Sequence, residues 1–115
     1  MEMIKSYPAE ISKKDKYRLM KSRAVQKMSS MDGNFIKPRA WILFNDEDFS
    51  TGEIRKVFVV QDDATGEMYG TISPTFIQDF EDIITIFGDN IDDGGFTPLL
   101  MEGKSGRSYL VCEVS

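Results

Sequence analysis

The sequence predicts a mainly β fold, an OB-fold-like five-stranded barrel with one helix between strands 3 and 4, plus a basic N-terminal extension. Three consecutive runs rich in β-branched and aromatic residues predict strands, one helical period follows them, and two more strand-like runs come after the helix. Strand, strand, strand, helix, strand, strand is the order of the OB-fold, a partly open barrel. We therefore expect the extension at residues 1–33 and the barrel at residues 34–115, within a single domain.

The first three strands are expected at Asn34–Asn45, Glu53–Asp62 and Glu67–Ser73. Pro38 has no amide hydrogen to donate to a ladder, so a bulge or an edge position is expected there. The residues Asp62-Asp-Ala-Thr-Gly66 favour a turn, because Asp, Thr and Gly accept the required backbone angles or bond to them. The second and third strands are therefore predicted to form a hairpin.

The helix is expected at Pro74–Phe87, with Ser73 as N-cap, Pro74 in the first turn and Gly88 as C-cap. Its apolar residues recur at helical spacing, which indicates a core-facing stripe that plugs the open end of the barrel. They are Phe76, Phe80, Ile83, Ile84 and Phe87. The last two strands are expected at Phe96–Glu102 and Arg107–Ser115.

The composition argues against several classes of protein. No histidine, P-loop, dinucleotide-binding glycine pattern or cysteine cluster occurs, so neither an enzyme nor a cofactor or metal site is expected. The acidic groups lack the spacing of a calcium loop and are interpreted as solvated turns. The lone Cys112 allows no internal disulfide and favours a reducing cytoplasm. No apolar run suits a signal peptide or a membrane span, so no membrane partner is expected.

Charge is divided unevenly along the chain. Residues 1–39 hold ten Lys and Arg against four Asp and Glu, whereas residues 40–115 hold four against fifteen, within a net charge of −5. Such asymmetry suggests a polyanion partner for the basic part, which would act as a clamp on phosphates. The alternative is a solvated helix or arm that pairs with the acidic barrel. The cations concerned are Lys13, Lys14, Lys16, Arg18, Lys21, Arg23 and Lys27.

The barrel itself offers aromatic rings and cations suited to a single strand, whose bases stack on aromatic side chains and whose phosphates attract cations. The candidate stacking platforms are Trp41, Phe58, Tyr69 and Tyr109, although a core position is the alternative for Trp41 and is favoured for Phe58. Trp41 leads because strict alternation places it on one face with Lys37 and Arg39. The candidate phosphate contacts on the barrel are Lys37, Arg39, Arg55, Lys56, Lys104 and Arg107.

The chain resembles the single-stranded DNA-binding proteins of small protein-primed bacteriophages, which replicate linear genomes by strand displacement. Three motifs in this order carry the resemblance, namely Asp32-Gly-Asn-Phe-Ile36, Gly66-Glu-Met-Tyr-Gly-Thr-Ile-Ser73 and Met101-Glu-Gly-Lys-Ser-Gly-Arg-Ser-Tyr-Leu110. The resemblance implies cooperative, sequence-independent coating of displaced strands in the cytoplasm of an infected bacterial host, with no cofactor and no catalysis. It leaves RNA and self-association along the strand open as further partners.

Two other classes remain open from the sequence. One is an inhibitor whose acidic surface mimics DNA and occupies a host nucleic-acid enzyme, which the acidity of residues 40–115 favours and the basic part opposes. The other is a protein–protein adaptor, in which exposed aromatic residues would serve as interface anchors. Direct binding of an oligonucleotide separates both from the DNA-coating hypothesis.

Overall fold

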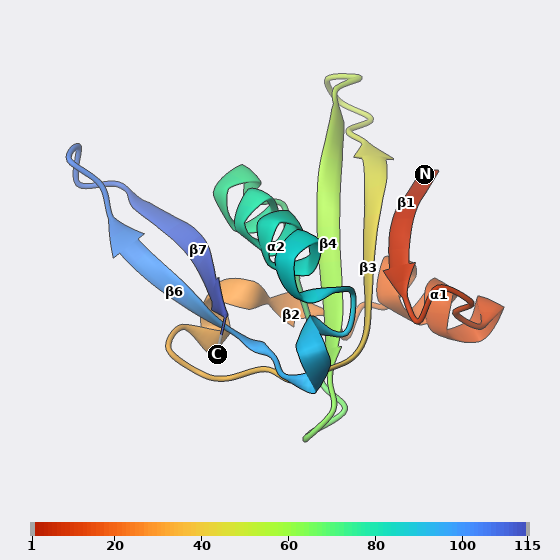
Figure 1. Cartoon of the computed structure of the whole chain (residues 1–115). Helices are drawn as coiled ribbons and strands as arrows, with labels where there is room; N and C mark the ends of the chain where they lie inside the picture. Colours follow the sequence, from red (N-terminus) through yellow and green to blue (C-terminus); the bar gives the residue numbers. More distant parts are fainter. Residues whose placement is uncertain (1, 115) are drawn as a thin grey trace.

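The computed structural model describes residues 2–114 and arranges them in two β-sheets and two α-helices (Figure 1). The larger sheet has the strand order β1-β3-β4-β5-β2, and β6 and β7 form a separate hairpin. The strands are β1 (Glu2–Tyr7), β2 (Gln26–Lys27), β3 (Pro38–Glu47), β4 (Ile54–Asp62), β5 (Met68–Thr71), β6 (Phe96–Glu102) and β7 (Ser108–Val114). The helices are α1 (Lys13–Lys21) and α2 (Pro74–Phe87), and the single 3-10 turns are η1 (Met28–Met31) and η2 (Ile91–Asp93).

The meander β3-β4-β5 confirms the three predicted strands within a few residues at their ends. Its strands are antiparallel, with Trp41 opposite Val60 and Val60 opposite Tyr69. The predicted bulge is confirmed as a register shift between Pro38 and Ala40. The predicted turn before β5 is also present, because the amide of Gly66 donates to the carbonyl of Asp62 at 2.8 Å.

Helix α2 has the predicted bounds and both predicted caps. The Ser73 hydroxyl accepts a hydrogen bond from the Phe76 amide at 3.4 Å, and Gly88 ends the helix at a φ of 86°, which glycine adopts without steric cost. The helix lies between β5 and β6, and no helix lies between β3 and β4. The helix was expected between strands 3 and 4. This position is wrong, because the unpredicted strands β1 and β2 precede the predicted ones and place the helix after the fifth strand.

The barrel is not closed, which corrects the expected architecture. Among the described residues, one isolated bridge from Ile36 to Phe96 links β6 to the segment before β3. The edges of the meander that closure would use are occupied: β1 pairs with β3, and β2 runs parallel to β5. The crossing at the bridge is tight, because a Cβ on Gly95 would lie 2.1 Å from the Ile36 carbonyl oxygen. Only glycine fits there.

Residues 2–31 are part of the fold, whereas residues 1–33 were expected as a basic extension. They provide β1 and β2 at opposite edges of the larger sheet, with α1 between them in sequence. Leu19 of α1 and Met28 of η1 are buried in the two core clusters. The strand β1 was missed because its charged residues hide the pairing pattern, and β2 because it has only two residues. Met1 and Ser115 of the predicted ranges lie outside the described residues.

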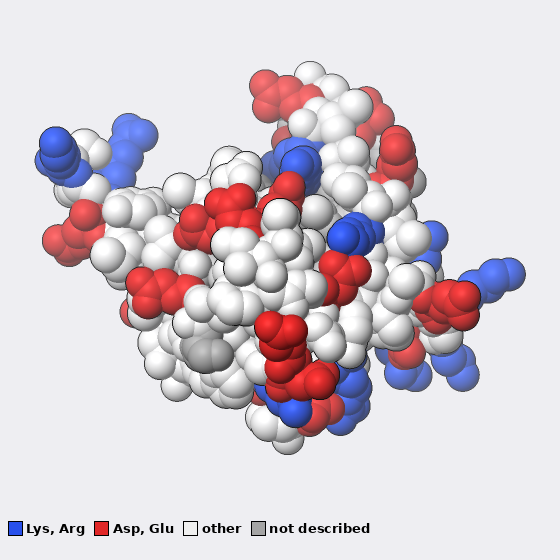
Figure 2. All heavy atoms as spheres, viewed as in Figure 1, with Lys and Arg blue, Asp and Glu red and all other residues white. Residues whose placement is uncertain are grey.

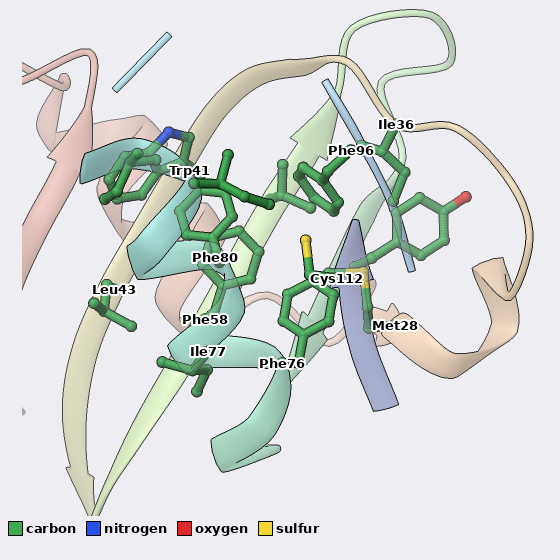
Figure 3. Packing of buried hydrophobic residues seen from close by; sticks show 14 of the residues in the cluster. Met28, Ile36, Trp41, Leu43, Phe58, Phe76, Ile77, Phe80, Phe96 and Cys112 are labelled. Atoms are coloured by element: carbon green, nitrogen blue, oxygen red, sulfur yellow. The ribbon is translucent and has the colours of Figure 1, made fainter. Parts of the chain in front are cut away.

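The main core lies between the sheet and α2, where aromatic rings converge (Figure 3). The Phe80 ring is 4.3 Å from that of Phe58 and 5.0 Å from that of Trp41, edge-on to the latter. The Trp41 indole Nε1 donates to the Asp89 carbonyl at 2.9 Å, so its polar group is satisfied inside the protein. A second, smaller cluster on the opposite sheet face is covered by α1 through Leu19.

Cys112 projects from β7 into the main core, where its free thiol is buried. Burial, and secondarily the charges of Asp79 and Glu113, raise the pKa of this thiol well above its ordinary value. The thiolate is therefore scarce and the side chain behaves as a small apolar group. Neither described helix is long and apolar enough to span a bilayer.

Candidate nucleic-acid interface

Helix α1 presents most of its cations to solvent because one residue fixes its orientation. Leu19 is buried against the sheet, whereas Lys13, Tyr17 and Lys21 lie on the opposite, exposed side. The helix begins at Ser12, whose hydroxyl accepts a hydrogen bond from the Asp15 amide at 3.1 Å. The acid in the first turn and the cations in the last turn both suit the helix dipole.

The exposed side of α1 carries an open concavity of about 360 Å³. The Tyr17 ring and the thioether of Met20 form its apolar part, and the stems of Lys13, Lys16 and Lys21 form the rim. Tyr17 is 69% exposed, far more than a ring recruited to a core. We call these five residues the α1 concavity.

The cations of the basic segment are largely without acidic partners. Of the seven Lys and Arg between residues 13 and 27, only Arg18 reaches a described acid within ion-pair distance, namely Asp15 at 3.7 Å. The predicted alternative, an arm that pairs with the acidic barrel, is supported at Lys5, which lies 2.9 Å from Asp89, but not by the cations of residues 13–27. The six other cations are available to an external polyanion.

Two further hollows extend this surface from α1 toward the β6–β7 hairpin. The first, of about 340 Å³, lies between α1, β2 and the sheet, and it shares Met20 with the α1 concavity. The second, also about 340 Å³, shares Lys27, Gly70 and Thr71 with the first and ends at Tyr109. The three hollows are thus linked in series by shared lining residues, from the α1 concavity past Lys27 to Tyr109, and we call this series the path.

Three of the four candidate stacking platforms are buried, which confirms the core position favoured for Phe58 and makes the stacking role predicted for Trp41 and Tyr69 wrong. Trp41 and Phe58 are 0% exposed and Tyr69 is 6% exposed. Exposing one such ring costs about 1.5–3 kcal/mol, which offsets the roughly 1–3 kcal/mol gained from one base stack. Binding that draws a buried ring out of the core therefore gains nothing. The bulge at Pro38–Ala40 explains the error for Trp41, because it breaks strict alternation and leaves Arg39 in solvent while Trp41 points inward.

Tyr109 is the one predicted platform on the surface, with 41% of its side chain exposed. It lies on β7 at the far end of the path. Sequence reasoning did not select Tyr17 as a platform, although this ring sits within the basic run. The available signal was an aromatic residue among lysines at helical spacing, on the face opposite the buried Leu19.

The predicted barrel cations separate into two groups. Arg39, Arg55 and Lys56 are engaged with acids, at 3.2 Å from Asp63, 3.7 Å from Asp48 and 3.0 Å from Glu81 respectively. Lys37, Lys104 and Arg107 are exposed and have no described ion-pair partner. Lys104 and Arg107 bracket the turn of the β6–β7 hairpin, whose amide at Gly103 donates to the Arg107 carbonyl at 2.8 Å.

The charges are separated in space as well as in sequence. In the view of Figure 2, Lys and Arg lie around α1 and at the end of the β6–β7 hairpin, with some acids beside them, whereas mainly Asp and Glu cover α2 and the end of the β3–β4 hairpin. A polyanion is thus attracted to α1 and to the hairpin end, and repelled from α2.

Among residues 2–114, no cluster of His, Cys, Asp and Glu is suited to hold a metal ion. Comparison of the chain with protein-family models, with curated proteins and with solved structures found no match. Any functional proposal for the chain therefore rests on the chemistry of its surface.

Proposed function

We propose that the chain binds single-stranded DNA without sequence preference, along the path from the α1 concavity to Tyr109. The observation that carries this proposal is the set of six cations between residues 13 and 27 that have no acidic partner among the described residues. The motif resemblance favours displaced DNA of a replicating phage genome as the strand that is coated. No catalytic step is part of the proposal.

The binding would combine two sequence-independent interactions. Lys13, Lys16, Lys21 and Lys27 would donate to phosphates and displace the counterions of the strand, so that affinity falls steeply with salt. Tyr17 and Tyr109 would each stack on a base, at about 1–3 kcal/mol per ring, because every base has a π-face. The acids on α2 would keep the strand on the α1 side of the molecule.

The test is fluorescence anisotropy with labelled oligonucleotides of unrelated sequence, titrated at several salt concentrations. Replacing Lys13, Lys16 and Lys21 by Gln should weaken binding to every sequence alike. The slope of log affinity against log salt should decrease by about 2, since each lost contact removes roughly 0.7 on single strands.

A matched control changes the net charge equally on cations that already have acidic partners, namely Lys5, Arg39 and Lys56 to Gln. This control should keep most of the affinity and the original slope. Equal losses in both variants would contradict a site on α1 and indicate attraction by net charge alone. Absence of binding at low salt would refute the proposal and favour the mimic or adaptor functions. A duplex and an RNA strand of the same sequence, run in parallel, determine the preferred nucleic acid.

A further inference from the structure

The most exposed large apolar side chain of the described residues is that of Phe49, at 100%. It projects from the end of the β3–β4 hairpin, among four acids and no cation within residues 46–53. We call Asp46, Glu47, Asp48, Phe49 and Glu53 the acidic tip. A lone exposed apolar residue is ordinary, but a ring surrounded by carboxylates at the end of a projecting hairpin presents a recognisable surface.

The acidic tip is held in shape by its own hydrogen bonds. Asp48 accepts from the amide of Ser50 at 2.9 Å and from its hydroxyl at 2.6 Å, and the Asp48 amide donates to the Glu53 carbonyl at 2.8 Å. The bonds from Ser50 lower the pKa of the Asp48 carboxyl, which therefore stays charged well below neutral pH. Little ordering is thus required of this loop when it meets a partner.

The α1 concavity is complementary to the acidic tip in both shape and charge. Its centre is apolar, through Tyr17 and Met20, and its volume of about 360 Å³ accommodates an aromatic side chain. Its rim carries three lysines without a described ion-pair partner, opposite in sign to the carboxylates that surround Phe49.

We propose that the acidic tip of one copy of this chain docks into the α1 concavity of a second copy. The Phe49 ring would pack against Tyr17 and Met20, and the carboxylates of the tip would meet Lys13, Lys16 and Lys21. The tip does not reach its own α1, because the β3–β4 ladder continues to the pair Glu47–Ile54 and holds the tip away from that helix (Figure 1). Each copy carries one tip and one concavity, so the contact is head-to-tail and can extend into a chain of copies.

The same concavity serves the proposed function, and the two uses share one chemistry. A ring flanked by carboxylates resembles a base flanked by phosphates, so cations and an aromatic wall can receive either. The self-association nevertheless does not rest on nucleic-acid binding. It is therefore tested without any nucleic acid, so that failure of one proposal leaves the other intact.

The experiment is sedimentation velocity of the full chain over a range of concentrations at low and high salt. The native protein should sediment faster as its concentration rises at low salt, and should return to the monomer at high salt because screening weakens the charge contacts. Phe49→Asp should remain monomeric, and so should a variant with Lys13, Lys16 and Lys21 changed to Glu. Circular dichroism should show that both variants are folded, because every substituted residue is exposed or on the rim of α1.

Mixing the two monomeric variants provides the decisive measurement. The first retains an intact concavity and the second an intact tip, so the mixture should form a one-to-one heterodimer that grows no further. Ile86→Asp is the matched control, because Ile86 is another exposed apolar residue, on α2, and its variant should associate like the native protein. A native chain that stays monomeric at low salt, a Phe49→Asp variant that associates normally, or a mixture that stays monomeric would each overturn the proposal.

Discussion

The indole ring of Trp41 fills the space between the larger sheet and α2, and its surroundings leave no route to a ligand. Phe58 and Phe80 pack against it on the core side, and the Asp89 carbonyl accepts the hydrogen bond from its only N–H group. An aromatic residue that follows two cations closely in the sequence is thus a core residue rather than a binding residue. The bulge at Pro38–Ala40 separates the surroundings of Arg39 from those of Trp41, and beyond it core clusters cover both faces of β3, so either face would have buried the ring.

Because Trp41 is the only tryptophan, its fluorescence reports directly on this core. We expect a blue-shifted emission that is insensitive to acrylamide in the native protein. A saturating oligonucleotide should leave this emission unchanged, while anisotropy of a label on the oligonucleotide shows binding. Quenching of Trp41 in step with binding would mean that the core opens to the strand, contrary to the burial described above.

At the scale of elements, local sequence patterns predict the five strands β3 to β7 and the helix α2. Caps, turn residues and hydrophobic periodicity determine α2 and the strands around it, which is why their bounds could be predicted within a few residues. The two remaining strands, β1 and β2, depend on partners at least 34 residues away in the chain, and no local pattern reveals such pairings. The candidate site shows the same contrast between local and long-range information. Its cations were predicted from charge alone, whereas its aromatic platforms depended on a strand register that the sequence did not determine.

Ser73 connects α2 to the second sheet and offers a test of that connection. Its hydroxyl accepts from the Phe76 amide and donates to the Leu110 carbonyl of β7, each at 3.4 Å. Ser73→Ala should lower the free energy of unfolding by about 1 kcal/mol, the usual cost of a lost N-cap. Urea titration measures this loss. Ser105→Ala, in the exposed hairpin turn, is the control and should change the free energy of unfolding by less than about 0.5 kcal/mol. Equal effects in the two variants would refute a structural role for the cap.

On the scale of the whole molecule, residues 2–31 and the meander form a single folding unit. The meander alone would expose both of its sheet edges and the apolar face that α1 covers through Leu19. Exposed edges and apolar faces promote aggregation rather than independent folding. The basic segment therefore stabilises the domain in addition to any contact with phosphates, and its charge alone did not reveal this second role.

Deleting residues 2–27 should therefore abolish cooperative unfolding rather than merely weaken binding. Thermal or urea denaturation followed by Trp41 fluorescence and by circular dichroism measures this, and the two signals should coincide in the full chain. A full-length variant with Lys13, Lys14 and Lys16 changed to Gln removes charge but no strand, and it should retain the sharp transition. A truncated chain with a sharp transition near that of the native protein would show that the segment is dispensable for folding.

The placement of β1 and β2 at opposite edges of one sheet also governs the order of events during synthesis. Residues 2–31 leave the ribosome before either pairing partner exists, since β1 must wait for β3 to reach Asn45 and β2 must wait for β5 to reach Gly70. During that wait the nascent segment has no surface on which to bury its apolar side chains. Its density of Lys and Arg keeps it hydrated and extended in the meantime. The emerging meander can then take up the waiting segment along one edge and afterwards along the other.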